Sequence, residues 1–402
     1  MLMTGKKALS DLALFGGKPL FSQVKSIGQL AQQNQARFFA LARKCFAERR
    51  LSNNGPMVQL LERRLADFHR VPHCIAYANA GLALIALIQS IAAGRAGSVV
   101  IPTFTYAGLP HIVRWAGQEP LFCDVDRDTH TLTAETASAA MAADTIMLLG
   151  VHQANSPCPI DELEELCRAR GITLLFDSVH GLGATYAGTP IGGFGRAEVF
   201  SLHATKLLNG FEGGYITTHD ENLADLLRRK RNFGFTGESS VDTLGMNAKL
   251  NELHAASALA ALDDLPALIE RNRSRIEAYR ESFAEIPGIS WIPYATANKT
   301  NHEFPLLQIA PDWPLARDTL FSILRAEGAL ARPYYAPPLH LQDNPSHAPL
   351  PVAEALSGQI VQMPAGESLS RDDIDTLAAL VDFAYIHAES ISSALAADGT
   401  SR

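Results

Sequence analysis

Between residues 73 and 260, short apolar runs alternate with stretches in which apolar side chains recur at helical spacing. Alternation of this kind is typical of a mostly parallel sheet covered by helices on both faces. The clearest candidate strands are 98–102, 120–125, 145–151, 172–177 and 197–202. The pattern therefore predicts an α/β fold.

Helical spacing is clearest in Ile160–Arg170, where apolar residues stand at positions 160, 163, 166 and 167 and Gly171 follows. We expect a crossover helix there. Beyond residue 250 the pattern becomes a long Ala-rich helix over 253–283, followed by a smaller α+β segment. That segment contains the apolar run 304–309, a helix near 317–327 and a closing helix near 371–388. From residue 388 onward we expect a frayed end.

The length of 402 residues exceeds one average domain. We divide the chain into an N-terminal arm with a first helix (1–50), a large domain (51–265) and a small C-terminal domain (266–402). Hydrophobic residues make up 47% and charged residues 19%, the balance of a soluble globular enzyme rather than of a disordered or fibrous chain.

The formal net charge of −8 gives no basic surface for nucleic acid or an anionic membrane. Five cysteines form no CxxC pair, which argues against a disulfide framework or a zinc site, and we expect no metal. No apolar run is long enough for a bilayer, and the first 21 residues do not resemble a signal peptide. These features predict a cytoplasmic protein with reduced thiols.

Two polar residues follow candidate strands. Asp177 ends the run ITLLF, and Lys206 ends SLHATK, in a glycine-bearing loop. The 29 residues between them leave room for one excursion and a return strand, so both loops can meet at the carboxyl edge of the sheet, where ligands gather in such folds. Taken singly, the acid is more typical of a helix cap or a salt-bridge partner, and the lysine of a solvated surface residue.

Together the acid and the lysine suit pyridoxal phosphate. This aldehyde cofactor requires a lysine amine, and a carboxylate beside its ring nitrogen keeps that nitrogen protonated. The phosphate needs free backbone N–H groups such as those at a helix N-terminus. The stretch Asn79-Ala80-Gly81-Leu82 opens a strongly helical run, although it also fits an ordinary turn into a helix.

Several stretches resemble the DegT/DnrJ family of sugar aminotransferases, over nearly the full length. The SxHxxK arrangement before EGG, in AEVFSLHATKLLNGFEGG at 197–214, is the most specific. Supporting stretches are LSNNGP at 51–56, FDSVHGLGA at 176–184, RNFGF at 231–235, NAKLNELHAA at 247–256 and APPLHL at 336–341. The resemblance implies the fold type I aminotransferase architecture, in which a large cofactor domain with a mostly parallel sheet is joined to a smaller C-terminal α+β domain.

The resemblance also implies roles at individual positions. Lys206 matches the lysine that links to the cofactor, Asp177 the partner of the pyridine nitrogen, and Ser201 a hydroxyl on the phosphate. Backbone groups of Ala80 and Gly81 would serve the phosphate as well. His180 takes the place of a residue lying against the ring, and Tyr106 that of the aromatic stacked on its other face.

Three further positions are carried over from the family. Asn247 matches an asparagine that reaches the cofactor phosphate of the neighbouring subunit, which implies a homodimer with shared active sites. Lys249 takes the place of a basic residue near the substrate, and His340 lies in a segment that borders the pocket in relatives. A solvated lysine and a core histidine remain open alternatives for these last two.

The chain departs from the family pattern at three places. Ala80-Gly81 replaces a Gly-Thr pair, so only backbone donors remain for the phosphate at that point. The stretch His152–Ser156 and the pair Ala107-Gly108 also differ, and both fall near the acceptor side in relatives. The expected acceptor is a nucleotide-linked keto sugar, aminated at C4 of a dTDP-4-keto-6-deoxyhexose, with an amino acid such as L-glutamate as donor. Alternatives are a 3-keto sugar, a keto-cyclitol, or a non-catalytic regulatory protein on the same fold.

Overall fold

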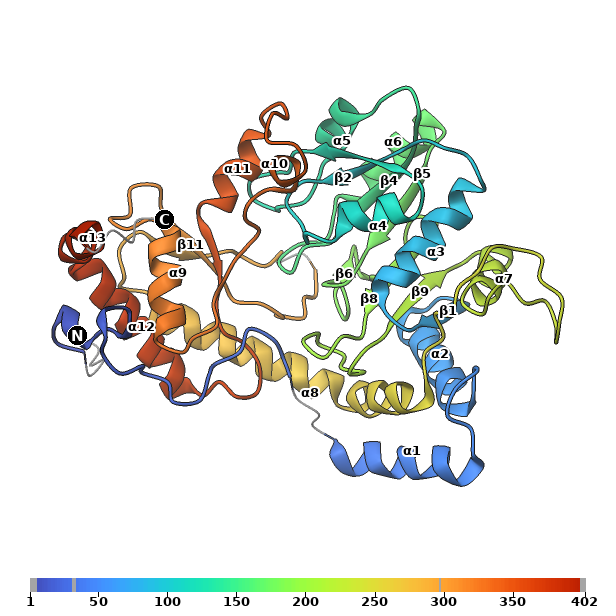
Figure 1. Ribbon diagram of the computed structural model, residues 1–402, viewed down its shortest axis with the longest axis horizontal. Helices are drawn as coiled ribbons and strands as arrows, with labels where there is room; N and C mark the ends of the chain where they lie inside the picture. Colours follow the sequence, from blue (N-terminus) through green and yellow to red (C-terminus); the bar gives the residue numbers. More distant parts are fainter. Residues whose placement is uncertain (1–5, 31–33, 296–297, 398–402) are drawn as a thin grey trace.

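The computed structural model describes residues 6–30, 34–295 and 298–397 of the chain (Figure 1). Its centre is a seven-stranded sheet in the order β1-β9-β8-β5-β4-β2-β3. Only β9 runs antiparallel to its neighbours, β1 and β8. The strands are β1 His73–Tyr77, β2 Ser98–Pro102, β3 Glu119–Cys123, β4 Thr145–Val151, β5 Thr173–Asp177, β8 Glu198–Ser201 and β9 Gly214–Thr218.

Helices cover both faces of this sheet because its strands are apolar on both sides. Along β5, Leu174 and Phe176 belong to one buried cluster while Leu175 belongs to the other. The first cluster lies under α1, α2, α6 and α8, and the second under α3, α4 and α7. The bounds are α1 Gln35–Glu48, α2 Pro56–His69, α3 Ala80–Ala92, α4 Leu109–Trp115, α5 Ala134–Ala140, α6 Ile160–Arg170 and α7 Glu221–Lys230.

The helix α8, Glu252–Ser282, runs as one piece across residue 265 and leads into the C-terminal region (Figure 1). A four-stranded antiparallel sheet follows, in the order β10-β11-β13-β12. Its strands are β10 Ile289–Trp291, β11 Leu306–Ile309, β12 Arg332–Pro333 and β13 Ile360–Gln362. The helices here are α9 Arg317–Ala326, α10 Leu339–Asp343, α11 Pro351–Ser357, α12 Arg371–Ile386 and α13 Ala388–Ala397. Between β5 and β8 in the chain, β6 Thr185–Tyr186 and β7 Thr189–Pro190 form a separate two-stranded hairpin.

The N-terminal arm lies against this C-terminal region. Leu12 and Phe21 belong to its buried cluster. The buried carboxylate of Glu327 accepts hydrogen bonds from the backbone N–H groups of Ala13 and Leu20, and it forms an ion pair with Lys6. The arm is therefore fixed to the end of α9, although more than 300 residues separate the two segments in the sequence.

The α/β fold class is confirmed, and each of the five predicted strands overlaps an observed one. The expectation of a frayed end was wrong for residues 388–397. They form α13, because Ala388 and Ile391 are buried against the C-terminal core, and residues 398–402 lie outside the described residues. All five cysteines are free and buried. Among the described residues, no helix is both long and apolar enough to cross a bilayer.

Candidate active site

A cavity of about 510 Å³ opens where the carboxyl ends of β5 and β8 meet the C-terminal region. Asp177 is the last residue of β5, and Lys206 stands in the loop after β8. Both side chains line this one cavity. The parallel pairing of β5 with β8 explains the arrangement, because strands that run the same way end at the same edge.

Burial opposes the charge of both groups. It raises the pKa of the Asp177 carboxyl, and this effect is opposed by the N–H of Val179 and by the nearby His180 and Lys206. It lowers the pKa of the Lys206 amine, and the carboxylates of Glu303 and Asp177 act against that. Perturbed titration of paired groups in a cavity is characteristic of catalytic sites.

The N-terminus of α3 forms one end of the cavity. Asn79 caps the helix, its side chain accepting from the N–H of Leu82 at 2.8 Å, and Ala80 and Gly81 face the cavity. Gly214, the first residue of β9, allows β9 to lie close to the start of α3, since a Cβ at this glycine would stand 2.4 Å from the backbone nitrogen of Ala80. This end of the cavity therefore offers helix N–H groups, which suit an anion.

Ser201 also lines this cavity and brings a hydroxyl group to it. Its oxygen accepts from the N–H of His203 at 3.2 Å, so the hydroxyl hydrogen is free to donate. Ser201 ends β8, and this places it at the same sheet edge as Asp177.

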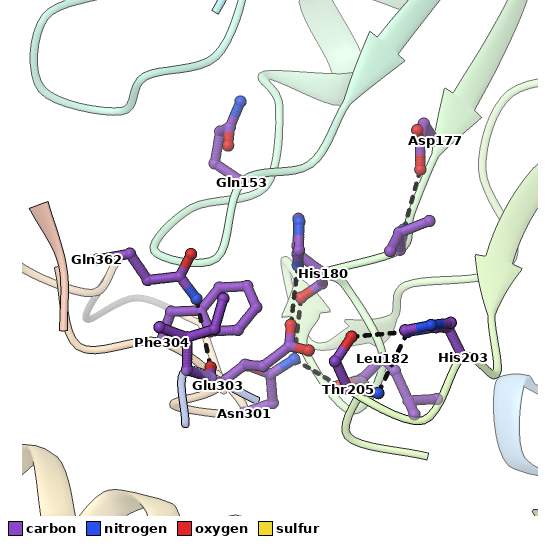
Figure 2. Close-up of polar contacts among 12 residues, drawn as sticks. Gln153, Asp177, His180, Leu182, His203, Thr205, Asn301, Glu303, Phe304 and Gln362 are labelled. Carbon is purple, nitrogen blue, oxygen red and sulfur yellow. Dashed lines mark hydrogen bonds and ion pairs between the residues drawn. The ribbon is translucent and has the colours of Figure 1, made fainter. Parts of the chain in front are cut away.

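Two rings stand at the walls of the cavity. Tyr106 is 65% exposed and lies over Gly108, where a Cβ would come within 2.4 Å of the tyrosine ring. His180 is buried, with its Nδ1 2.9 Å from the carboxylate of Glu303 (Figure 2). Its Nε2 lies 3.4 Å from the hydroxyl of Tyr335. His180 is therefore held on both sides, while Tyr106 is open to a ligand.

The C-terminal region contributes cavity residues that no sequence pattern marks. Phe304 lies with its ring centroid 5.8 Å from the Lys206 amine. Arg332 and Tyr335 also line the cavity, and the positive charge of Arg332 acts to lower the pKa of Lys206. These residues belong to no motif that the pattern of the chain makes visible, and only the packing of the two regions brings them in.

Asn247 and Lys249 do not line this cavity within one chain. The amine of Lys249 donates to Oδ1 of Asn232 at 2.9 Å and lies 4.8 Å from the ring centroid of Phe233. Asn247 is exposed beside them, paired with Asn232 through a backbone bridge.

His340 also lies outside the cavity lining, in the core position that the sequence left open as an alternative. Its side chain is fully buried, with Nδ1 2.7 Å from the hydroxyl of Thr103 and Nε2 3.2 Å from Glu354. It joins β2 to α10 and α11. Similarly, His152–Asn155 are buried and none of them lines the described cavity.

Residues 32–382 match the DegT/DnrJ/EryC1/StrS aminotransferase family. The chain belongs to this family. Among curated relatives, the dTDP-4-amino-4,6-dideoxy-D-glucose transaminase of Shigella dysenteriae is 26% identical over 80% of this chain and 85% of its own. The enzyme of the same name from Escherichia coli is 25% identical over 84% and 92%. The predictions of an aminotransferase and of this family are thus confirmed.

Solved structures agree on the fold. A crystal structure of DesI in the presence of its TDP-sugar product matches with a TM-score of 0.90 and 36% identity, over 96% of this chain and 99% of that one. The PLP-form of the putative sugar aminotransferase Spr1654 from Streptococcus pneumoniae matches with a TM-score of 0.81, over 92% of this chain and 100% of that one. At 21% identity the second match shows the fold alone.

Proposed function

We propose that this protein transfers the amino group of an amino acid, such as L-glutamate, to C4 of a dTDP-linked 4-keto-6-deoxyhexose, for amino-sugar biosynthesis. The observation that carries the proposal is the single cavity shared by Lys206, Asp177 and the N-terminus of α3. The substrate class follows the names of the DesI and transaminase relatives. The cofactor is pyridoxal phosphate.

The cavity residues fit this cofactor. The N-terminal turn of α3 and the Ser201 hydroxyl would hold the phosphate, and the carboxylate of Asp177 would hold the ring nitrogen. Tyr106 has an exposed ring face for stacking. Bound pyridoxal phosphate supplies an aldehyde for the lysine amine and an electron-poor ring that accepts carbanion charge.

Side chains of this protein carry out the proton transfers of the reaction. Once the donor has displaced it, the Lys206 amine takes a proton from the α-carbon of the donor, and it returns a proton when the keto sugar is aminated. Asp177 keeps a proton on the ring nitrogen, since a carboxylate in a dry site favours a cation in contact with it. Tyr106 and His180, which both line the cavity, would confine the ring.

The decisive experiment offers the purified protein glutamate, pyridoxal phosphate and a panel of nucleotide-linked 3-keto and 4-keto sugars, with products identified by mass spectrometry. A 4-amino product supports the proposal, whereas a 3-amino product alone would move the acceptor to the alternative class. The variant Lys206→Ala serves as the control and should give no product. A wild-type protein with neither product nor a visible cofactor band would indicate a non-catalytic protein on the same fold.

We also propose a homodimer with shared active sites. Asn247 is exposed, and three large apolar residues in the surrounding segment are exposed with it: Phe233, Val241 and Leu244. Apolar side chains gathered on one surface segment indicate a protein contact. In such a dimer Asn247 would reach the phosphate site of the partner subunit. A cytoplasmic location stays a prediction.

A further inference from the structure

Glu303 is a buried carboxylate that reaches the cavity region from the segment before β11. Its side chain is only 1% exposed, with Oε2 2.9 Å from Nδ1 of His180 (Figure 2). The neighbouring Asn301 fixes this arrangement: its Oδ1 accepts from the N–H of Glu303, and its Nδ2 donates to the carbonyls of His180 and Leu182. The carboxylate and the imidazole are thus held together by one asparagine.

The second oxygen of the same carboxylate, Oε1, is buried and has no hydrogen-bond partner. Burying an ionised carboxylate costs free energy that a single contact with His180 offsets only in part. A fold that keeps such a group gains something other than stability from it.

That gain concerns Lys206, whose amine lies 5.8 Å from the ring centroid of Phe304, the residue next to Glu303 in the chain. Of the charges that act on the lysine amine, Glu303 has the largest effect, ahead of Asp177, and both oppose the lowering of its pKa by burial. Arg332 acts in the opposite direction. Three phenols also lie within the influence of Glu303, and burial raises the pKa of each: Tyr294, Tyr334 and Tyr335.

We propose that Glu303 is a second carboxylate of the active site, which positions His180 against the cofactor ring and stabilises the ammonium that forms when Lys206 takes up a proton. Asp177 would then act on the ring nitrogen, and Glu303 on the lysine. The inference rests on the proposed function, because it assigns Lys206 the role of base. His180 is the positioned group, and Glu303 acts on Lys206 through space.

The test is a pH titration of the visible absorbance of the cofactor in the holoenzyme, compared between wild type and two uncharged variants, Glu303→Gln and Glu303→Met. Removing a negative charge near the lysine nitrogen disfavours its protonated form, so the midpoint should fall by about one pH unit in each variant. Glu303→Asp keeps the charge and should stay within about 0.3 unit of wild type. Two uncharged variants are used so that a folding defect in one leaves the other to decide.

The chain offers a matched control in another histidine–glutamate pair, His340 and Glu354, which lies outside the cavity lining. Glu354→Gln should leave the midpoint unchanged. Borohydride trapping followed by peptide mass spectrometry shows whether Lys206 is linked to the cofactor at all. If wild type lacks that link, the proposed function and this inference both fall. If wild type has the link and a folded uncharged variant titrates like it, only the inference falls.

Discussion

The buried carboxylate of Asp177 and the buried amine of Lys206 favour the charged form of each other. Asp177 acts to raise the pKa of Lys206, and Lys206 acts to lower that of Asp177, while burial works against both. The pair is therefore held in place at a cost in stability, as is usual for catalytic groups in a dry cavity.

A first prediction concerns the cofactor-free protein and the variant Asp177→Asn. Burial raises the folded-state pKa of Asp177 above its ordinary 3.8, so the folded chain keeps a proton that the unfolded chain has released. The unfolded state then binds fewer protons, and the free energy of unfolding falls as pH rises through the folded-state pKa. Asparagine has no such proton. Urea unfolding at a series of pH values should show this fall in wild type and not in the variant; parallel curves would contradict it.

Much of the large domain could be predicted because its signals are local. The run Thr145–Val151 and the helix Ile160–Arg170 were predicted with the observed bounds. The meeting of Asp177 and Lys206 followed from the strand-loop pattern and the parallel sheet rule.

What the sequence did not reveal depends on long-range packing. Arg332 lines the cavity from the C-terminal region and Glu303 acts on Lys206 from behind the lining, and no periodicity or spacing marks either residue. His340 belongs to the stretch APPLHL, which resembles the family, but His340 and its partners Thr103 and Glu354 lie on three segments that only the fold brings together. The helix α13 was missed because its Ser and Ala residues carry little pattern.

A second prediction concerns Gly81, which stands where relatives in the family have a threonine. A Cβ at this glycine would have Asn79 Oδ1 at 3.4 Å and Ile112 at 3.7 Å as its nearest neighbours, so a side chain fits. Gly81→Thr should place a hydroxyl at the phosphate end of the cavity, where one new hydrogen bond is worth about 1 kcal/mol, or roughly fivefold in affinity. The measurement is the dissociation constant of pyridoxal phosphate. Weaker binding in the variant would argue that the phosphate lies elsewhere.

A third prediction concerns Gly108, which lies under Tyr106. A Cβ there would stand 2.4 Å from the tyrosine ring, so Gly108→Ala must displace the ring. If Tyr106 stacks on the cofactor, affinity for pyridoxal phosphate should fall about tenfold, since aromatic contacts contribute roughly 0.5–1.5 kcal/mol beyond their buried area. Gly358→Ala controls for the change of a glycine, because a Cβ there would meet only the Ala355 carbonyl oxygen, at 3.6 Å. An unchanged affinity in Gly108→Ala would remove Tyr106 from the cofactor site.

A fourth prediction concerns the ion pair between α4 and α10. Both amino groups of the Arg114 guanidinium bind the carboxylate of Asp343, at 2.5 and 2.9 Å, and hold its pKa below the ordinary value. Because the folded-state pKa is lowered, the stabilisation is present above 3.8 and is lost as pH falls through the folded-state value. Asp343→Asn should cost about 0.5 kcal/mol at neutral pH, a small effect because the pair is partly exposed. Chemical unfolding measures this change in the free energy of unfolding. Asp225→Asn, which removes the exposed ion pair between Asp225 and Arg228 on α7, serves as the comparison.

The last prediction tests the proposed dimer at Leu244, whose side chain is 76% exposed. If this segment packs against a partner subunit, Leu244→Asp buries a charge in an apolar contact and should shift the protein toward monomer, as measured by sedimentation velocity. Loss of the partner would also remove Asn247 from the phosphate site, so affinity for pyridoxal phosphate should fall in parallel. Asn247→Ala separates the two effects, because it should weaken cofactor binding while the dimer persists. A monomeric Leu244→Asp variant with wild-type cofactor affinity would place the phosphate site wholly within one chain.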